Sequence, residues 1–231
     1  MRKPGASSHD LTAARRTLAS TGWLSEQPPD FRDRILSACR FAAFAPGERL
    51  YSLNGPPGGM FGIASGYVSV VANAGRFEPV LIYIGGPGLW AGEAAAVGKT
   101  ERRVELMART RVKALQLPAF ELERIGSEDA ALWRRLHGLT ASHFDNALMF
   151  AFTLKRGNPR QKIAATLVRL AGSAAEDDDV TVPCSQTELG ELAGLSRSTV
   201  GPALKALEAN GLVRVGYGRI TYRPRRLRDE T

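Results

Sequence analysis

Side chains that usually bind metals or act as nucleophiles are scarce in this sequence. The histidines are His9, His137 and His143, and the cysteines are Cys39 and Cys184. A zinc site needs at least three converging ligands, whereas the spacing of His137 and His143 puts them on different faces of a helix. No Gly-x-Ser-x-Gly elbow, P-loop or Ser/His/Asp order is present. We therefore expect no metal site and no enzyme, because nothing supplies a nucleophile and its base.

A different chemistry is encoded between residues 185 and 222. Ser185 and Glu188 form a capping box that opens a short helix. Gly194 allows a tight turn, and Ser196 caps a second helix that runs to about residue 210. Two short strands, 212–215 and 219–222, follow as a hairpin. Helix, turn, helix and hairpin together predict a winged helix-turn-helix.

The second helix of such a unit enters the DNA major groove with its N-terminal residues at the base edges. Arg197 can donate two hydrogen bonds to guanine. Phosphate oxygens suit the hydroxyls of Ser196 and Thr199, the ammonium group of Lys205 and the N-terminus of the first helix. The candidate DNA-binding residues are Ser185, Gln186, Ser196, Arg197, Ser198, Thr199, Lys205 and Arg219. The pattern could also be ordinary helix packing, but the basic hairpin and tail favour DNA; their arginines are Arg214, Arg219, Arg223, Arg225, Arg226 and Arg228.

The composition agrees with a polyanionic partner. The 231 residues carry a formal net charge of +8, with a sequence pI of about 9.9. Hydrophobic residues make up 44%, enough for a buried core, yet no apolar run is long enough to span a bilayer. The basic N-terminus has no apolar stretch behind it, so a secretory signal is not expected. We expect a cytoplasmic protein that does not bind membranes.

Residues 40–117 have the sequence pattern of a β domain. Short segments rich in β-branched and aromatic residues are separated by Gly and Pro, with further turns such as Asn73-Ala74-Gly75. The predicted strands are 49–53, 61–71, 76–84, 102–108 and 112–117. This spacing predicts an antiparallel roll or sandwich, and a metal-binding cupin is excluded because the region contains no histidine.

Helical patterns flank the β domain. A helix is predicted over 29–39, a short one over 120–125 that breaks near Gly126-Ser127, and a long one beyond it. The long helix carries a heptad-like seam that we expect to form a dimer interface: Trp133, Leu136, Thr140, His143, Ala147, Phe150 and Leu154. A second apolar stripe lies beside the seam: Leu132, Leu139, Phe144, Leu148 and Ala151. One stripe would face the chain's own barrel and the other a second chain, although a single wide core stripe remains an alternative.

These elements divide the chain into four segments. Residues 1–22 are a polar, variable terminus that we expect to fray around a possible short helix. Residues 23–126 form the roll, 127–156 form the dimerisation helix with its hinge, and 157–231 form the winged helix-turn-helix. The hinge is placed at Lys155-Arg156-Gly157-Asn158-Pro159, across the boundary between the last two segments, because proline resists helix continuation.

The segments Ser185-Gln186-Thr187-Glu188-Leu189-Gly190 and Leu195 to Gly201, followed by Leu204-Lys205-Ala206-Leu207-Glu208, resemble the DNA-binding signature of the CRP/FNR transcriptional regulators. The resemblance covers roughly residues 23–223. It implies an α+β fold with an N-terminal antiparallel β-roll (a cyclic-nucleotide-binding-like jelly roll), a long dimerisation helix and a C-terminal winged helix-turn-helix. It also implies a homodimer that reads an inverted-repeat site in double-stranded DNA and acts on RNA polymerase.

The chain departs from the family pattern at the recognition helix. Family members often have Arg-Glu at its start and a second Arg after Val-Gly, where this chain has Arg197-Ser198 and Pro202. Ser198 cannot accept a hydrogen bond from cytosine as a carboxylate does, and Pro202 has no N–H to donate. We expect a base preference that differs from the common family half-site, and we expect Pro202 to bend the helix.

The resemblance also implies an effector pocket, formed by Gly92, Glu93 and a phosphate-pairing arginine that is either Arg102 or Arg103. A cyclic nucleotide is possible but disfavoured, because the small hydroxyl residue expected after that arginine is missing and the polar pair that meets the base is replaced by Ala147 and Leu148. With only Cys39 in the N-terminal part and no histidine in the roll, neither an iron–sulfur cluster nor haem is expected. No cofactor is certain.

These observations favour a homodimeric DNA-binding transcription regulator, with a roll that could be controlled by a small effector. Effector binding would shift the long helix and re-aim the two winged helices. The main alternative is a ligand-binding regulatory module that acts on protein partners through the long helix. Salt-sensitive retention on DNA separates the two.

Overall fold

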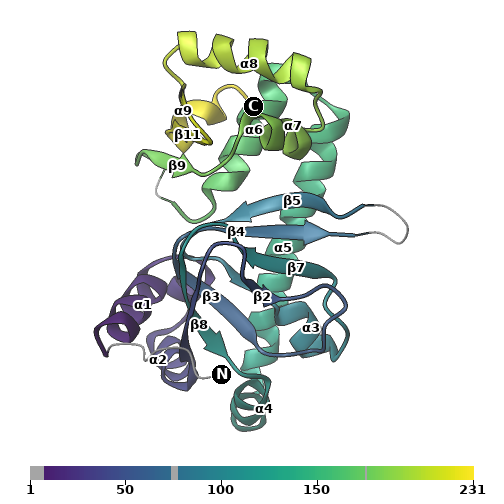
Figure 1. Cartoon of the computed structure of the whole chain (residues 1–231). Coiled ribbons are helices and arrows are strands. Elements are labelled where there is room, and N and C mark those ends of the chain that lie inside the picture. Colours follow the sequence, from purple (N-terminus) through teal and green to yellow (C-terminus); the bar gives the residue numbers. More distant parts are fainter. Residues whose placement is uncertain (1–7, 74–77, 175) are drawn as a thin grey trace. The chain divides into compact units, whose positions relative to one another are not determined.

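The computed structural model describes residues 8–73, 78–174 and 176–231 (Figure 1). It contains two compact units that meet in sequence at Ser142: the first comprises the chain up to Ser142 apart from Leu81–Ile84, and the second comprises those four residues and His143–Thr231. Within these described ranges, no helix combines the length and apolar character that crossing a bilayer requires. The α+β fold class expected from the sequence is confirmed.

Two four-stranded sheets, as far as the chain is described, have the strand orders β1-β8-β3-β6 and β2-β7-β4-β5, and all their strands belong to the first unit apart from residues 81–84 of β5. The ladders joining β1, β8, β3 and β6, and those joining β2, β7 and β4, are antiparallel. An apolar cluster that includes Phe61, Ile63, Val68 and Leu106 forms between strands of both sheets. The strands are β1 (Arg40–Phe44), β2 (Arg49–Tyr51), β3 (Met60–Ser65), β4 (Val68–Ala72), β5 (Val80–Gly85), β6 (Trp90–Ala91), β7 (Val104–Ala108) and β8 (Val112–Leu117).

The strand boundaries differ from the predicted ones at several places: β2 ends at Tyr51 and not at 53, β5 begins at Val80 and not at 76, β7 begins at Val104 and not at 102, and β6 was not predicted. The stretch predicted as one strand over 61–71 is two strands, because Gly66 adopts φ 83° and turns the chain. A Cβ there would lie 2.2 Å from the carbonyl oxygen of Arg111. Strand β1 was not predicted, since Arg-Phe-Ala-Ala-Phe lacks the alternation that marks a strand. The predicted turn at Asn73-Ala74-Gly75 lies outside the described residues beyond Asn73.

Helices α1 (Ser8–Ser20), the short η1 (Trp23–Glu26) and α2 (Pro29–Ala38) cover the sheet that contains β3 and β8 (Figure 1). The expectation of a frayed N-terminus is wrong for residues 8–20, because Ala14 and Leu18 are buried in the core. Helix α1 approaches β3 closely at Gly62, where a Cβ would lie 2.6 Å from the indole of Trp90 and 2.9 Å from Leu18 Cδ1. Helix α2 was predicted correctly.

Cys39, at the end of α2, is a buried packing residue. Burial raises the pKa of its thiol to about 12, so the thiol stays protonated at neutral pH. This agrees with its interpretation from sequence as a small apolar residue and not a reactive one.

Three helices follow or interrupt the strands: α3 (Glu93–Gly98), α4 (Ala119–Glu128) and α5 (Ala131–Lys155). The predicted break at Gly126-Ser127 is wrong, because α4 continues through both residues and the break falls at Asp129-Ala130. Leu132, Leu136 and Leu139 of α5 are buried in the same core as α1 and α2. The long helix itself was predicted.

The second unit contains the predicted helix–turn–helix and hairpin, joined by two elements that the sequence did not reveal. These are the strand β9 (Val180–Val182) and the short helix α9 (Pro224–Arg228). In the described chain, β9 pairs with β11 to give the order β10-β11-β9. Tyr222 is buried and its hydroxyl donates to the carbonyl of Leu167 at 2.6 Å. The remaining elements are α6 (Pro159–Ala171), α7 (Gln186–Ala193), α8 (Arg197–Ala209), β10 (Val213–Gly216) and β11 (Arg219–Tyr222).

Candidate nucleic-acid interface and buried cradle

The helix–turn–helix is fixed by local capping and by one close approach. The Ser185 N–H donates to Glu188 Oε2 at 2.9 Å, and the Glu188 N–H donates to Ser185 Oγ at 3.2 Å, which is the predicted capping box. Helices α7 and α8 approach at Gly190, where a Cβ would lie 2.9 Å from the Leu195 carbonyl oxygen and 3.0 Å from Val200 Cγ2. Gly190 therefore sets how tightly the two helices can pack, a role that the sequence pattern alone did not reveal.

The N-terminus of α8 presents a cationic side chain beside a cluster of hydroxyls. Arg197 is the first residue of α8 and is exposed. Ser196 Oγ lies 2.9 Å from Ser198 Oγ and 2.8 Å from Thr199 Oγ1. Lys205 is exposed two turns further along. Residues four apart share a helix face, so Arg197 and Lys205 lie on one side of α8.

The first helix and the hairpin supply the remaining candidates. Gln186 is exposed at the start of α7, whereas the hydroxyl of Ser185 is already engaged with Glu188. In the β10–β11 hairpin, Arg219 is exposed opposite Gly216, next to the fully exposed Tyr217 at the tip. The candidate residues of the second unit therefore leave their cationic groups available to a polyanion.

The basic tail is arranged differently from the prediction. Arg223 donates to Asp179 at 2.6 Å, Arg225 to Asp177 at 3.2 Å and Arg228 to Glu176 at 2.9 Å. The hydrogen bond from Arg223 lowers the pKa of Asp179, so that carboxylate stays charged. The acidic loop 176–179 therefore neutralises three of the arginines that the sequence assigned to phosphate binding.

Helix α8 is drawn as one continuous helix (Figure 1). Pro202 lies inside it and is exposed. Proline has no N–H, so the carbonyl of Ser198 loses its helical partner. Pro202→Ala is expected to raise the free energy of unfolding by about 1 kcal/mol, because it restores that hydrogen bond. Urea denaturation of the full chain measures the change. The opposite change, Ala206→Pro, introduces a proline one turn later at an exposed position and should lower the free energy of unfolding by roughly 3 kcal/mol. An unchanged denaturation midpoint for Pro202→Ala would contradict the claim that Pro202 costs α8 a hydrogen bond.

The candidate effector residues surround a buried cradle in the first unit. Arg102 is 4% exposed, and its guanidinium donates to the carbonyls of Gly92 at 2.9 Å and Gly59 at 2.6 Å. Glu93 is also 4% exposed, with its Oε1 3.5 Å from Thr140 Oγ1. Arg103 is exposed. Of the two arginines that the sequence left open, the structure brings Arg102 to Gly92 and Glu93.

The Arg102 guanidinium keeps donors that these two contacts do not use. A guanidinium carries five N–H groups, and the hydrogen bonds to Gly92 and Gly59 use one on each terminal nitrogen. The Nε–H is buried without a hydrogen-bond partner in the described part of the chain. The cradle therefore holds a buried cation whose hydrogen-bonding capacity is only partly used.

The predicted dimer seam of α5 is wrong at its N-terminal end. Leu136 is fully buried, and Trp133 is partly buried against the same core, so Leu136 has no surface to offer a partner. The hydroxyl of Thr140 donates to the Leu136 carbonyl at 3.1 Å. Of the remaining seam residues, Ala147 is exposed, whereas His143, Phe150 and Leu154 are half-buried.

The exposed apolar surface of α5 lies in the later part of the helix and includes two residues of the second stripe. Phe144 is 62% exposed, Leu148 51%, Met149 60% and Phe152 60%. Phe144 and Leu148 belong to the second stripe identified in the sequence. A run of large apolar side chains this exposed is unusual on a monomer.

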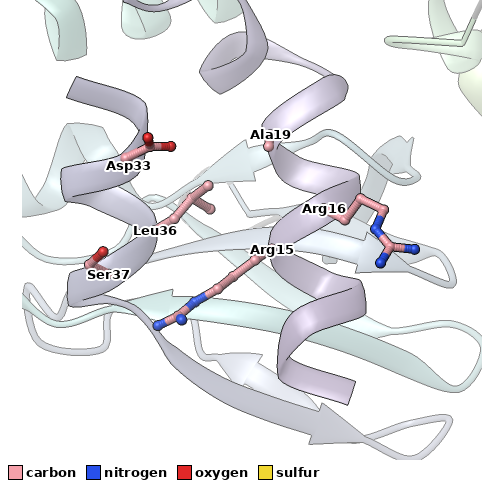
Figure 2. A pocket seen from close by; sticks show the side chains of 6 residues that line it. All are labelled: Arg15, Arg16, Ala19, Asp33, Leu36 and Ser37. Carbon is pink, nitrogen blue, oxygen red and sulfur yellow. The ribbon is translucent and has the colours of Figure 1, made fainter. Parts of the chain in front are cut away.

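A groove between α1 and α2 is lined by Arg15, Arg16, Ala19, Asp33, Leu36 and Ser37 (Figure 2). Figure 2 shows Arg15 extending towards Ser37, whereas Arg16 extends to the opposite side. The Asp33 carboxylate lines the same groove. The two guanidinium groups therefore do not converge on one anion.

Comparison with known proteins identifies both units. The cyclic nucleotide-binding domain family matches residues 41–129, and the Crp-like helix-turn-helix domain family matches residues 161–230. No curated protein matches the chain.

Solved structures share the fold along nearly their whole length. FixK2 from Bradyrhizobium japonicum has a TM-score of 0.71 at 21% identity, covering 83% of this chain and 96% of that one. The c-di-GMP responsive global regulator CLP of Xanthomonas campestris has a TM-score of 0.62 at 21% identity, covering 84% and 99%. A CRP/FNR-family transcriptional regulator of Thermus thermophilus has a TM-score of 0.61 at 22% identity, covering 83% and 97%.

A cyclic-nucleotide-binding-type roll followed by a Crp-like helix-turn-helix defines a DNA-binding transcriptional regulator with an effector-type domain. The chain belongs to the CRP/FNR family of transcriptional regulators. The sequence resemblance is thus confirmed at the level of family and fold.

Proposed function

We propose that two copies of the chain read an inverted-repeat operator, each placing α8 in the major groove. The observation that carries this proposal is the exposed Arg197 at the first position of α8, beside the hydroxyls of Ser196, Ser198 and Thr199. Arg197 would read guanine, and the hydroxyls, Lys205 and Arg219 would contact phosphates. Gln186 and the N-terminus of α7, at Ser185, would hold the backbone on the other side of the groove.

We further propose that the dimer forms through the exposed apolar face of α5, defined by Phe144, Leu148, Met149 and Phe152. Their exposure supports this choice over the seam that begins at Trp133. The dimer would act in the cytoplasm and control transcription by contacting RNA polymerase, with no catalytic step. In this proposal residues 23–126 are the effector-type domain, 127–156 are the dimerisation helix and hinge, and 157–231 are the DNA-binding domain.

Selection of duplexes from a random library with the purified full-length protein tests the proposal. The expected result is an inverted repeat whose half-sites are centred about one helical turn, roughly 34 Å, apart. Because Ser198 and Pro202 replace side chains that would read bases, the half-site should differ from the common family half-site. Recovery of unrelated sequences, with no salt-dependent retention, would favour the alternative of a module that acts on protein partners.

The acidic loop makes a separate prediction about non-specific affinity. The double variant Asp177→Asn/Asp179→Asn should bind a scrambled duplex more tightly, because it releases Arg223 and Arg225 for phosphates. The slope of log K against log salt should steepen by about 0.9 for each additional phosphate that the protein neutralises. Fluorescence anisotropy across a salt series measures both quantities. Asp229→Asn serves as the control, because it removes one negative charge from an exposed residue of the same tail. Equal salt slopes for the wild-type protein, the double variant and this control would contradict the prediction.

A further inference from the structure

One face of α8 carries Ser198, Pro202 and Ala206. These residues follow one another at intervals of four, so they share one side of the helix. All three are exposed. The buried residues of α8 lie on its other side: Val200, Ala203, Leu204 and Leu207. A DNA groove that receives α8 therefore meets the face that contains Pro202.

This face is apolar at its centre. The side chains of proline and alanine are hydrocarbon, and the Ser198 hydroxyl lies 2.9 Å from Ser196 Oγ. Arg197 and Lys205 belong to the neighbouring row of the helix, because they are separated from each other by two turns. The groups that Pro202 itself offers to a base edge are ring methylenes.

Pro202 is unfavourable for the fold of the helix that contains it. A proline inside a helix removes one hydrogen bond, and its ring crowds the carbonyl one turn earlier, here that of Ser198. The residue is exposed, so burial within the chain does little to offset this cost. Residues that violate a local rule without a gain in stability are expected at functional sites.

Gly201, the residue before Pro202, leaves room for a close approach. A Cβ built on Gly201 would meet no atom within 4 Å, so packing in the described chain does not require glycine at this position. Gly190 differs, because a Cβ there would meet the Leu195 carbonyl oxygen at 2.9 Å. The missing side chain at Gly201 lets the backbone of α8 approach the bases closely beside the proline ring.

We infer that Pro202 reads a thymine in each half-site through contact with the C5 methyl group of that base. This inference rests on the proposed function and deepens it by naming a base of the operator. In the major groove, the thymine methyl is the apolar group on the base edges. Proline also has no side-chain rotamers to lose on binding. A cytosine, guanine or adenine opposite the ring would lose water from a donor or acceptor that the ring cannot replace, so these bases are disfavoured.

Removal of single methyl groups from the DNA is the first test. The probe is the duplex that the full-length wild-type protein selects, with each symmetric pair of thymines replaced in turn by deoxyuridine, which lacks only the methyl. At one pair we expect binding to weaken by about 10-fold, because one buried methyl is lost in each half-site. Fluorescence anisotropy measures the affinities. A selected operator without thymine, or one that tolerates uracil at every position, would overturn the inference.

Restoration of the methyl on a different base is the complementary measurement. A cytosine–guanine pair at the sensitive position should weaken binding more than uracil does, because the cytosine amino group then faces the ring. Replacing that cytosine with 5-methylcytosine should recover part of the loss. No recovery would mean that the protein does not recognise the methyl group.

Variants at position 202 test whether the proline ring makes the contact. In Pro202→Ser the uracil penalty at the sensitive pair should disappear, and in Pro202→Ala, which keeps only the Cβ, it should shrink. Both variants regain the helical N–H, so they should melt at or above the wild-type temperature. Ala209→Ser is the matched control, because it adds a hydroxyl at an exposed position two turns later; it should keep the full penalty. An undiminished penalty in Pro202→Ser would overturn the inference.

Arg197→Ala, measured on the same duplexes, separates this inference from the proposed function. A protein that selects no operator would overturn both. An operator whose binding depends on Arg197 but not on the thymine methyl would leave the proposed function standing and overturn the role of Pro202 alone.

Discussion

Replacing Arg197 with alanine is expected to weaken binding to the selected operator by about 30-fold or more. A bidentate arginine–guanine pair contributes roughly 1–3 kcal/mol, and a two-fold dimer contains two such pairs, so the loss begins at about 2 kcal/mol. Arg197 is exposed at the first position of α8, which means that its removal should not destabilise the unit. Fluorescence anisotropy with the selected duplex and a scrambled duplex, at fixed salt, measures the change.

The matched control is Arg219→Ala, which removes an exposed arginine of the hairpin. If Arg219 contacts phosphate, its loss should weaken both duplexes by the same factor and reduce the salt slope. Arg197→Ala should instead reduce the ratio between the two affinities. An equal loss on both duplexes would make Arg197 a phosphate contact, and no loss on either would remove α8 from the interface.

Placing charge on the exposed face of α5 is expected to convert the protein to a monomer. The double variant Leu148→Glu/Phe152→Glu replaces two side chains that are 51% and 60% exposed in the single chain. Two-fold symmetry puts four carboxylates into the interface, and each buried without a partner costs on the order of 1 kcal/mol or more. The four together cost about 4 kcal/mol, so the dimer dissociation constant should rise by roughly 1,000-fold or more. Sedimentation over a concentration series measures it.

Phe120→Glu is the matched control, because Phe120 is an equally exposed aromatic residue (56%) on α4. Its substitution should leave the oligomeric state unchanged. A dimer that persists in the α5 variant, or a wild-type chain that is monomeric throughout, would mean that this face does not join two copies. Specific DNA affinity should fall together with dimerisation, because a single half-site offers too little contact for specific occupancy.

Elements with local signals could be predicted from the sequence. Helix α7 is encoded by the capping box of Ser185 and Glu188, which acts within a few residues. Ser196 occupies the N-cap position of α8 as predicted, but its side chain makes no capping hydrogen bond. The hairpin β10–β11 is encoded by Gly216-Tyr217-Gly218 between two apolar pairs. In each case the residues that specify the element are part of it, so no distant contact is required to recognise it.

Elements whose stability comes from distant contacts could not be predicted from the sequence. Helix α1 has a polar sequence and buries only Ala14 and Leu18, so its order depends on β3 and Trp90, far along the chain. Strand β9 has three residues and is defined by its pairing with β11. Neither element has a hydrophobic pattern long enough to identify it from its own sequence.

The candidate site was ambiguous for a similar reason. Arg102 and Arg103 are adjacent, and in an extended segment neighbouring side chains point to opposite sides, so the sequence cannot say which one turns inward. Along α5, the sequence offers two apolar stripes, and neither stays wholly outside. Leu132 and Leu139 of one stripe and Leu136 of the other pack into the core, so only the packing shows that the exposed apolar side chains lie in the later part of the helix.

The close fit between α1 and Gly62 implies that a segment able to fold on its own must include α1. Helix α1 shields one edge of the Trp90 indole, and strand β3 carries no Cβ at the point where the helix rests. A fragment starting at Trp23 would expose the Trp90 indole and the surface of β3 around Gly62 to water. Exposed apolar surface of this kind promotes aggregation. The match to the cyclic nucleotide-binding domain family begins at residue 41, whereas the segment that folds with the roll includes helix α1 from Ser8.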